Sequence, residues 1–177
     1  MKKTIAIDMD GVLADIEAHS LRLYKAYSGV TLSKKDILGK EEWNMLPEGL
    51  FKIFIHKEGF FRNAPVMDGA IEAVAKLSEE FEVYIVSAAM EFPLSLSEKH
   101  EWLLEHFPFI SWKNIVFCGN KSIINADYMI DDHRKNLDTF KGKALMFSAF
   151  HNHGQNHHDR FDNWKSIVSF LEKELAV

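Results

Sequence analysis

The order of apolar and polar positions along the chain predicts alternating strands and helices. Thr4–Ile7 is a short apolar run of strand length that leads directly into an acidic segment. From Asp15 to Tyr27, apolar residues recur three and four positions apart, and Ser28-Gly29 follows as a stop signal. The chain therefore opens with a strand followed by a helix.

The segment from Val30 to Ala64 has a different composition. Aromatic and aliphatic residues alternate there with Lys and Glu, and glycines and a proline interrupt the pattern. It is too long for a usual strand-to-helix loop and too apolar for a linker. We interpret residues 16–64 as a small helical cap inserted after the first strand, and residues 1–15 and 65–177 as the core domain.

The remainder of the chain continues the alternation. Helical spacing predicts helices over about 69–80, 94–107 and 164–175, with Asp68 as the N-cap of the first. Runs of β-branched and aromatic residues predict strands at 81–86, 114–118, 128–130 and 144–147. This pattern predicts an α/β fold, a Rossmann-like parallel sheet of about five strands with helices on both faces.

Composition narrows the class of protein. A length of 177 residues suits one core domain with a modest insertion, and 47% apolar and 27% charged residues are typical of globular chains. A net charge of −5 argues against binding of polymeric nucleic acid but allows one small anionic ligand. The single cysteine, Cys118, excludes an intrachain disulfide and fits a small buried strand residue. With neither a signal peptide nor a membrane span visible, we expect a cytoplasmic protein.

Two of the predicted strands end in pairs of acids. Asp8 and Asp10 follow the first strand, and Asp131 and Asp132 follow the strand at 128–130. A strand that ends in acids is usually a site, and the alternative for the first pair alone is an ordinary strand followed by an acidic turn, since Asp-Gly is also a common turn pair. If the two strands are neighbours, however, the carboxylates converge at the ligand-binding edge of the sheet and repel one another unless a cation or shared protons relieve them. All-oxygen ligands favour Mg²⁺, which commonly also binds a substrate phosphate.

Other strand ends supply groups that bind anions. Ser87, the backbone N–H groups of the turn through Ala88, and Lys121 together offer a hydroxyl, amides and an ammonium group. Each residue alone is more typical of a turn or a solvated surface. Their occurrence at successive strand ends, together with four aspartates, favours a phosphate site.

These segments resemble those of a known superfamily. Asp8-Met9-Asp10-Gly11-Val12, Ser87, Lys121 and Asp131-Asp132 resemble the four ordered motifs of the haloacid dehalogenase-like phosphatases. A closer resemblance is to the 5′(3′)-deoxyribonucleotidase branch, through residues 8–15 (DMDGVLAD), residues 126–132 (ADYMIDD), His151-Asn152 and Trp164. The resemblance covers nearly the whole chain and is weakest in the cap. It implies a Mg²⁺-dependent phosphatase acting on nucleoside monophosphates, with a deoxyribose sugar and a 5′- or 3′-phosphate.

The resemblance also implies roles for these residues. Asp8 would be the nucleophile that forms an aspartyl-phosphate, and Asp10 the general acid and base. Asp8, the backbone carbonyl of Asp10 and Asp132 would hold Mg²⁺, with Asp131 as support or as the alternative ligand. The phosphate-binding group would be Ser87, Ala88 and Lys121.

The cap would then contact the base and sugar. The candidates are Ile16, Trp43, Phe51, Phe54 and Phe61. The chain departs from vertebrate relatives at Ile16, where they have an aromatic residue, at Ser87-Ala88, where they have Thr-Ser, and at His133, where relatives often have arginine. These departures leave the base and sugar preference open.

Two other functions remain as alternatives. The divergent cap is compatible with a phosphosugar or another small phosphate ester as substrate. A nucleotide-binding or phosphate-binding regulator without turnover is disfavoured, because a sensor would not need Asp10. As partners we expect a small nucleoside monophosphate, no polymeric nucleic acid and no membrane, and we allow for a homodimer. The run from His151 to His158 fits no structural zinc pattern, and we interpret it as a polar loop.

Overall fold

The computed structural model describes residues 2–175, and its centre is a fully parallel six-stranded sheet. The strand order is β3-β2-β1-β4-β5-β6. The predicted fold class is confirmed, with six strands where about five were expected. The strands are β1 (Thr4–Ile7), β2 (Glu82–Ser87), β3 (Ile115–Phe117), β4 (Tyr128–Asp131), β5 (Lys143–Phe147) and β6 (Asp159–Phe161).

Seven α-helices and several short 3₁₀ turns connect and cover these strands in the described chain. No helix within residues 2–175 combines the length and the apolar character that a membrane crossing requires. The helices are α1 (Ile16–Ser28), α2 (Lys34–Ile37), α3 (Leu50–Ile55), α4 (Ala70–Glu80), α5 (Ser95–His106), α6 (Arg134–Leu137) and α7 (Trp164–Leu175).

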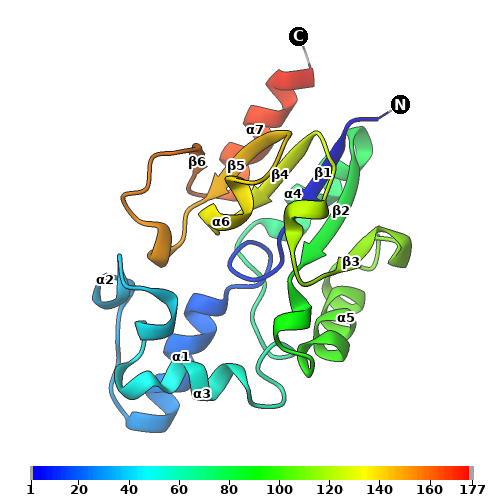
Figure 1. Ribbon diagram of the computed structural model, residues 1–177. Helices are drawn as coiled ribbons and strands as arrows, with labels where there is room; N and C mark the ends of the chain where they lie inside the picture. The colour runs from blue at the N-terminus through cyan, green and yellow to red at the C-terminus, as the bar shows by residue number, and fades with distance from the viewer. Residues whose placement is uncertain (1, 176–177) are drawn as a thin grey trace.

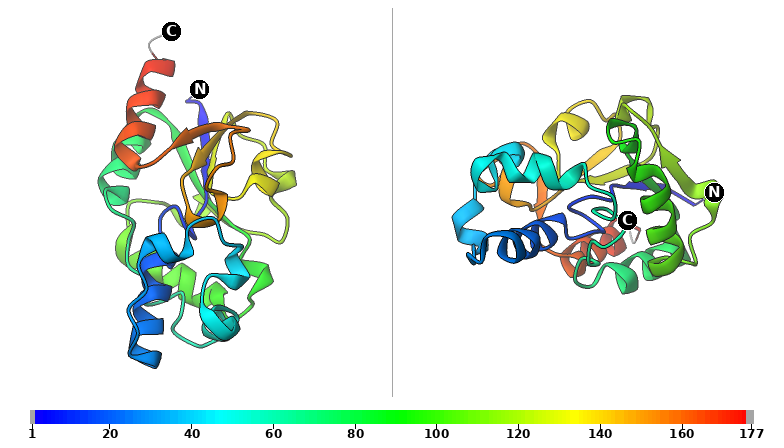
Figure 2. Two further views of the ribbon diagram at one scale, coloured as in Figure 1. Left: turned by 90° about the vertical axis from the view of Figure 1, so that its left-hand side faces the viewer. Right: turned by 90° about the horizontal axis from the view of Figure 1, so that it is seen from below.

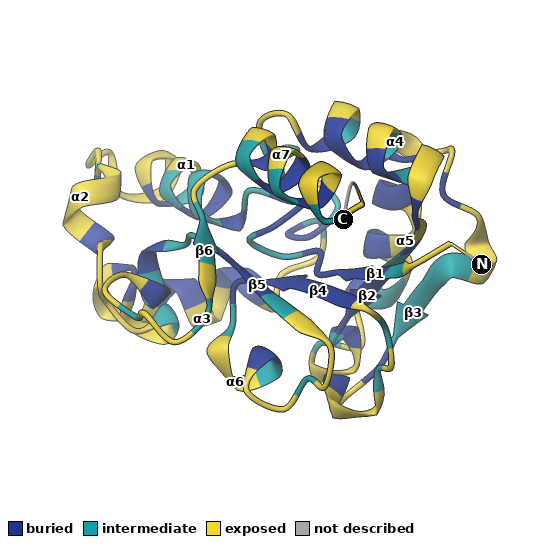
Figure 3. Cartoon of the chain, turned by 90° about the horizontal axis from the view of Figure 1, so that it is seen from above, coloured by how far each residue is buried: buried dark blue, intermediate teal, exposed yellow. Residues whose placement is uncertain are grey.

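The sheet separates two apolar layers of unequal size. Alternate side chains of β1 point to opposite faces, so Ile5 and Ile7 join the large core under α4, α5 and α7, whereas Ala6 faces the smaller layer. That smaller layer includes Met129 of β4 and Leu137 of α6. Figure 3 shows the buried strands between α7 and α4 on one side and α6 on the other. Both faces of the sheet are therefore covered, as a parallel sheet requires.

One strand was not expected from the sequence, and one predicted N-cap was wrong. The sixth strand, β6, pairs with the outer edge of β5, but its sequence, Asp-Arg-Phe, is too short and polar to show a strand pattern. Helix α4 has Gly69, and not Asp68, at its N-cap. Gly69 adopts φ 73°, a left-handed conformation that glycine reaches without a steric penalty.

The cap lies beyond the carboxyl ends of the strands, at the opposite end of the molecule from both termini (Figures 1 and 2). It contains α1, α2 and α3. The two connections to the core run side by side, since Asp15 N–H donates to the Pro65 carbonyl and Met67 N–H to the Leu13 carbonyl. The division expected at 15/16 and 64/65 stays a prediction.

Candidate active site

The central position of β1 brings the predicted site residues together. β1 lies between β2 and β4, so the loop after Ile7 is flanked by Ser87 at the end of β2 and by Asp131 at the end of β4. The two acidic strands are neighbours, as the charge argument required. Asp8, Asp131 and Asp132 are all buried, and their carboxylate oxygens lie within 4.8 Å of one another.

Lys121 neutralises part of this acidic cluster. Its Nζ lies 2.6 Å from Asp8 Oδ1 and 2.7 Å from Asp131 Oδ2. Burial lowers the pKa of Lys121, but the two carboxylates outweigh burial and the net shift is upward. Burial and the other aspartates raise the pKa of Asp8 well above its usual value, against the opposing effect of Lys121. Asp8 therefore needs further positive charge in order to be an effective nucleophile at neutral pH.

The two acids of the second pair have different surroundings. Both oxygens of Asp131 accept hydrogen bonds, from Lys121, the His133 N–H and the Asn136 side chain. Asp132 Oδ2 lies 3.0 Å from His151 Nε2, whereas its buried Oδ1 has no hydrogen-bond partner among the described residues. The pKa of Asp132 is lowered despite its burial, because the imidazoles of His133 and His151 outweigh the desolvation. Asp132 thus keeps an ionised oxygen free for a ligand.

This arrangement fits a hard divalent cation. The donors are carboxylate oxygens with one unpartnered buried oxygen, which suits Mg²⁺ better than a soft metal. Asp10 Oδ2 is bound to Lys99, whereas its buried Oδ1 has no hydrogen-bond partner among the described residues. The free Oδ1 of Asp132 favours this residue over Asp131 as the direct ligand.

Gly11 allows Asp132 to approach the β1 loop closely. Its φ is 76°, and a Cβ atom built at this position would lie 2.2 Å from Asp132 Oδ2. A side chain here would therefore both strain the backbone and displace the carboxylate.

Lys99 of α5 is a site residue that the sequence analysis missed. Its Nζ lies 2.5 Å from Asp10 Oδ2, 3.0 Å from Ser87 Oγ and 4.4 Å from the ring centroid of the cap residue Phe61. A fully buried lysine is rare unless it is paired. Its position on the buried face of α5, one turn before Trp102, was the available signal.

A cleft separates the core residues from the cap. Asp8, Asp10, Ala88 and Lys121 line its core side, and Ile16, Trp43 and Phe61 line its cap side. Ser87 does not reach the wall, because its hydroxyl lies buried beneath Lys99. Glu42, Glu91, Phe92 and Asn136 also line the cleft and were not predicted.

The other two aromatic candidates lie elsewhere. Phe51 is fully buried, packs against Trp43 with ring centroids 5.9 Å apart, and faces a second cavity next to the cleft. Phe54 packs against Tyr27 inside the cap and is not among the lining residues of the cleft. The prediction that Phe54 contacts the base is thus not supported by its position, because its ring completes the packing between α1 and α3.

The loop that returns from the cap is tied to the core through α5. Glu98 accepts backbone hydrogen bonds from Gly59, Phe61 and Arg62. Glu98 and Lys99 are adjacent, so one turn of α5 holds both the cap loop and the Asp10 carboxylate.

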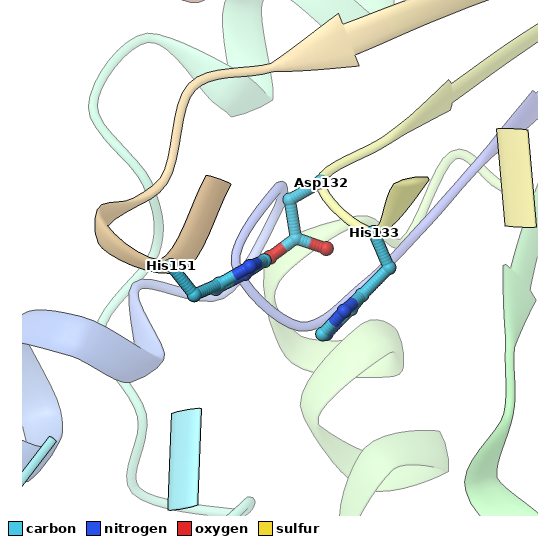
Figure 4. Close-up of side chains that lie close together, drawn as sticks. All are labelled: Asp132, His133 and His151. Atoms are coloured by element: carbon cyan, nitrogen blue, oxygen red, sulfur yellow. The ribbon is translucent and has the colours of Figure 1, made fainter. Parts of the chain in front are cut away.

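His151 is the one member of the histidine-rich run that reaches the acidic cluster. Figure 4 shows the carboxylate of Asp132 beside the rings of His151 and His133. The two rings are stacked, with centroids 4.4 Å apart. His158 instead contacts Asp138, and His153 is exposed.

The fold is that of the haloacid dehalogenase-like proteins. A haloacid dehalogenase-like protein from Streptococcus pneumoniae has a similar structure, with a TM-score of 0.61 over 96% of this chain and 98% of the other at 13% identity. A family model described as "5′ nucleotidase, deoxy (Pyrimidine), cytosolic type C protein" matches residues 2–175, and the chain belongs to this family.

Curated relatives agree with this family assignment. Proteins named 5′(3′)-deoxyribonucleotidase from Bacillus subtilis strain 168 and from Bacillus phage SPbeta are each 42% identical over 170 residues, covering 94% of this chain and 97% of theirs. The predicted resemblance and the predicted enzyme class, a phosphoric monoester hydrolase, are both confirmed.

Proposed function

We propose that this protein is a Mg²⁺-dependent phosphatase that hydrolyses deoxyribonucleoside 5′- or 3′-monophosphates through an aspartyl-phosphate on Asp8. The observation that carries the proposal is that two ion pairs line the cleft. Asp8 pairs with Lys121, and Asp10 pairs with Lys99. Two carboxylates two residues apart thus have separate cationic partners, which suits separate roles. The names of the relatives support the substrate class.

Asp8 is suited to nucleophilic attack. Its Oδ1 contacts Lys121 and accepts the Met9 N–H, which leaves Oδ2 as the oxygen available to phosphorus. Attack forms an Oδ2–P bond while the bond from phosphorus to the nucleoside oxygen breaks. Mg²⁺, held by Asp8, Asp132 and the Asp10 carbonyl, would supply positive charge that keeps Asp8 ionised and offsets charge on the phosphoryl oxygens.

Asp10 is suited to proton transfer. It lines the cleft, and its Oδ2 is held by Lys99. For the first step Asp10 must be in its protonated form, so that its carboxyl proton passes to the departing nucleoside oxygen and leaves Asp10 as a carboxylate beside Lys99. In the second step it takes a proton from the water that attacks phosphorus, as the bond from phosphorus to Asp8 breaks and inorganic phosphate leaves.

The remaining residues would position the substrate. Lys121 and Ala88 line the cleft, and the Lys121 ammonium group and the Ala88 N–H would bind the phosphoryl group. Ser87 would act from behind Lys99, through the hydrogen bond that fixes that lysine. Ile16, Trp43 and Phe61 would form the apolar wall for the sugar and base, together with Phe92.

A substrate panel with and without Mg²⁺ tests the proposal. We expect deoxynucleoside 5′- or 3′-monophosphates to be hydrolysed with a much higher kcat/KM than p-nitrophenyl phosphate or hexose phosphates. Equal or slower turnover of the nucleotides would contradict it and favour the phosphosugar alternative.

The Asp8→Asn variant tests whether the protein is an enzyme or a regulator that binds phosphate without turnover. We expect it to release no phosphate while retaining its fold by circular dichroism, and a chelator to stop the wild type. Phosphate release that survives both treatments would contradict the proposed mechanism. The homodimer stays a prediction, which sedimentation velocity would test.

A further inference from the structure

Four side chains of the types that ligate metals, from three separate segments, lie beside the proposed Mg²⁺ site. Asp132 and His133 follow β4, His151 lies after β5, and Glu42 comes from the cap. His133 Nε2 lies 3.5 Å from Glu42 Oε2, and His151 Nε2 lies 3.0 Å from Asp132 Oδ2. The ligand atoms of Asp132, His133 and His151 all lie within 4.8 Å of one another.

Two of the distances between these donors are close to the spacing expected around a tetrahedral metal. Metal–ligand bonds of 2.0–2.1 Å put neighbouring donors about 3.3 Å apart. The two contacts of 3.0 Å and 3.5 Å bracket that value. The two imidazole rings are stacked, so their side chains must rotate before both rings can direct a nitrogen at one ion. The side chain of His133 is 27% exposed and has room to rotate.

The ligand types differ from those of the acidic cluster. Two imidazoles with two carboxylates favour Zn²⁺ and similar transition metals over Mg²⁺, and two carboxylates balance the charge of a divalent ion. The buried Asp132 Oδ1, which has no hydrogen-bond partner in the described chain, shows that this carboxylate has coordinating capacity left. All four residues also line a single cavity next to the catalytic cleft, through which an ion could enter.

We propose that Asp132, His133, His151 and Glu42 form a second metal site, which binds Zn²⁺ or a similar transition metal and inhibits the enzyme. Binding there takes Asp132 away from Mg²⁺. It also joins Glu42 of the cap to three core residues, which holds the cap in place over the cleft. The binding part of this inference stands alone, and the inhibition part rests on the proposed function.

Titration with Co²⁺, followed by its visible absorption, and with Zn²⁺, followed by calorimetry, tests binding without Mg²⁺ or substrate. We expect one ion per wild-type chain, with a cobalt spectrum typical of nitrogen and oxygen ligands. Glu42→Gln and His133→Asn should each weaken binding by at least about 10-fold. The matched controls, Glu41→Gln and His153→Asn, change exposed neighbours and should bind as the wild type does.

Asp8→Asn distinguishes the two metal sites. Asp8 is not a ligand of the proposed site, so this variant should retain cobalt and zinc binding. Loss of binding in Asp8→Asn, with binding unchanged in Glu42→Gln and His133→Asn, would place the ion in the acidic cluster and overturn the inference. Absence of binding to the wild type would also overturn it.

Inhibition is measured separately. In excess Mg²⁺, Zn²⁺ should inhibit phosphate release by the wild type and by His153→Asn at lower concentrations than it inhibits His133→Asn. Equal inhibition of all three would overturn the inhibitory role. If the protein hydrolyses no nucleotide, the proposed function fails, while the binding titrations still decide whether the second site exists.

Discussion

Lys99 Nζ lies 2.5 Å from Asp10 Oδ2, so a buried cation on α5 fixes the proposed proton-transfer group on the β1 loop. Only one third of the Asp10 side chain is exposed, and Lys99 is the more buried partner. The same ammonium group contacts Ser87 Oγ and faces the ring of Phe61. Lys99 therefore connects the acid–base group, the end of β2 and the cap.

Replacing Lys99 by methionine should remove the contacts of the ammonium group while keeping an unbranched apolar side chain at this position. We expect kcat to fall on the order of 10²-fold with a small change in KM, because the carboxylate loses its orientation. Steady-state kinetics on the best nucleotide measures both constants, with the exposed lysine variant Lys113→Met as control. An increase in KM at unchanged kcat would mean that Lys99 binds substrate instead of positioning Asp10.

The Asp10→Asn variant tests proton transfer directly. Its side chain keeps the shape but cannot give or take the proton, so kcat should fall by a factor on the order of 10² to 10⁴. The loss should be smaller for a nitrophenyl ester, whose departing oxygen needs no proton. An effect below about threefold on the nucleotide would exclude Asp10 as the acid–base group.

Gly11→Ala should lower both the free energy of unfolding and the affinity for Mg²⁺. The alanine Cβ would strain the backbone at φ 76° and overlap Asp132 Oδ2. Gly29→Ala is a matched control, since Gly29 has φ 74° with no atom within 4 Å of its Cβ. Urea unfolding should show a loss of about 1–3 kcal/mol for each from backbone strain. Only Gly11→Ala should also need more Mg²⁺ for half-maximal activity.

His19 should make the protein less stable in mild acid. Burial, with a smaller effect of Arg22, lowers the pKa of His19 from 6.5 to about 4. The folded state thus resists protonation while the unfolded state accepts it, so this stability is complete above pH 6.5 and is lost as the pH falls toward 4. Between pH 7.5 and pH 5 the loss should be about 2 kcal/mol.

Urea unfolding of wild type and His19→Gln at the two pH values isolates this effect. The variant removes the titrating ring, so its stability should fall less between pH 7.5 and pH 5 than that of the wild type. Equal decreases for the two proteins would show that other groups cause the acid sensitivity.

The sequence predicted the sheet well because hydrophobic periodicity and strand-end signals are local. In the sequence, apolar runs followed by polar residues mark β1, β2 and β4. Because β1 and β4 are neighbours in the sheet, Asp8 and Asp132 lie close together. β6 could not be predicted in this way, since its three residues are held by pairing with β5 and not by their own pattern.

The candidate site was predictable where side chains follow strands and unpredictable where they come from elsewhere. Lys99 and Glu42 belong to α5 and to a turn of the cap, and their distance from Asp10 and His133 depends on how the layers pack. Phe54 shows the converse, since an aromatic residue in the cap can equally pack within it. Composition predicts a cap, but only tertiary structure decides which of its residues reach the cleft.

The adjacency of Glu98 and Lys99 has a mechanical consequence. Three amides of residues 59–62 are bound to Glu98, so this part of the cap behaves as an extension of α5 and keeps a fixed distance from the reacting atoms. Residues 30–55 have no such tether to α5 among the described hydrogen bonds, and we expect changes in their sequence to affect the Asp10 carboxylate less than changes at residues 59–62. Substrate preference can thus diverge in one part of the cap while the rate of the chemical step is conserved by the other.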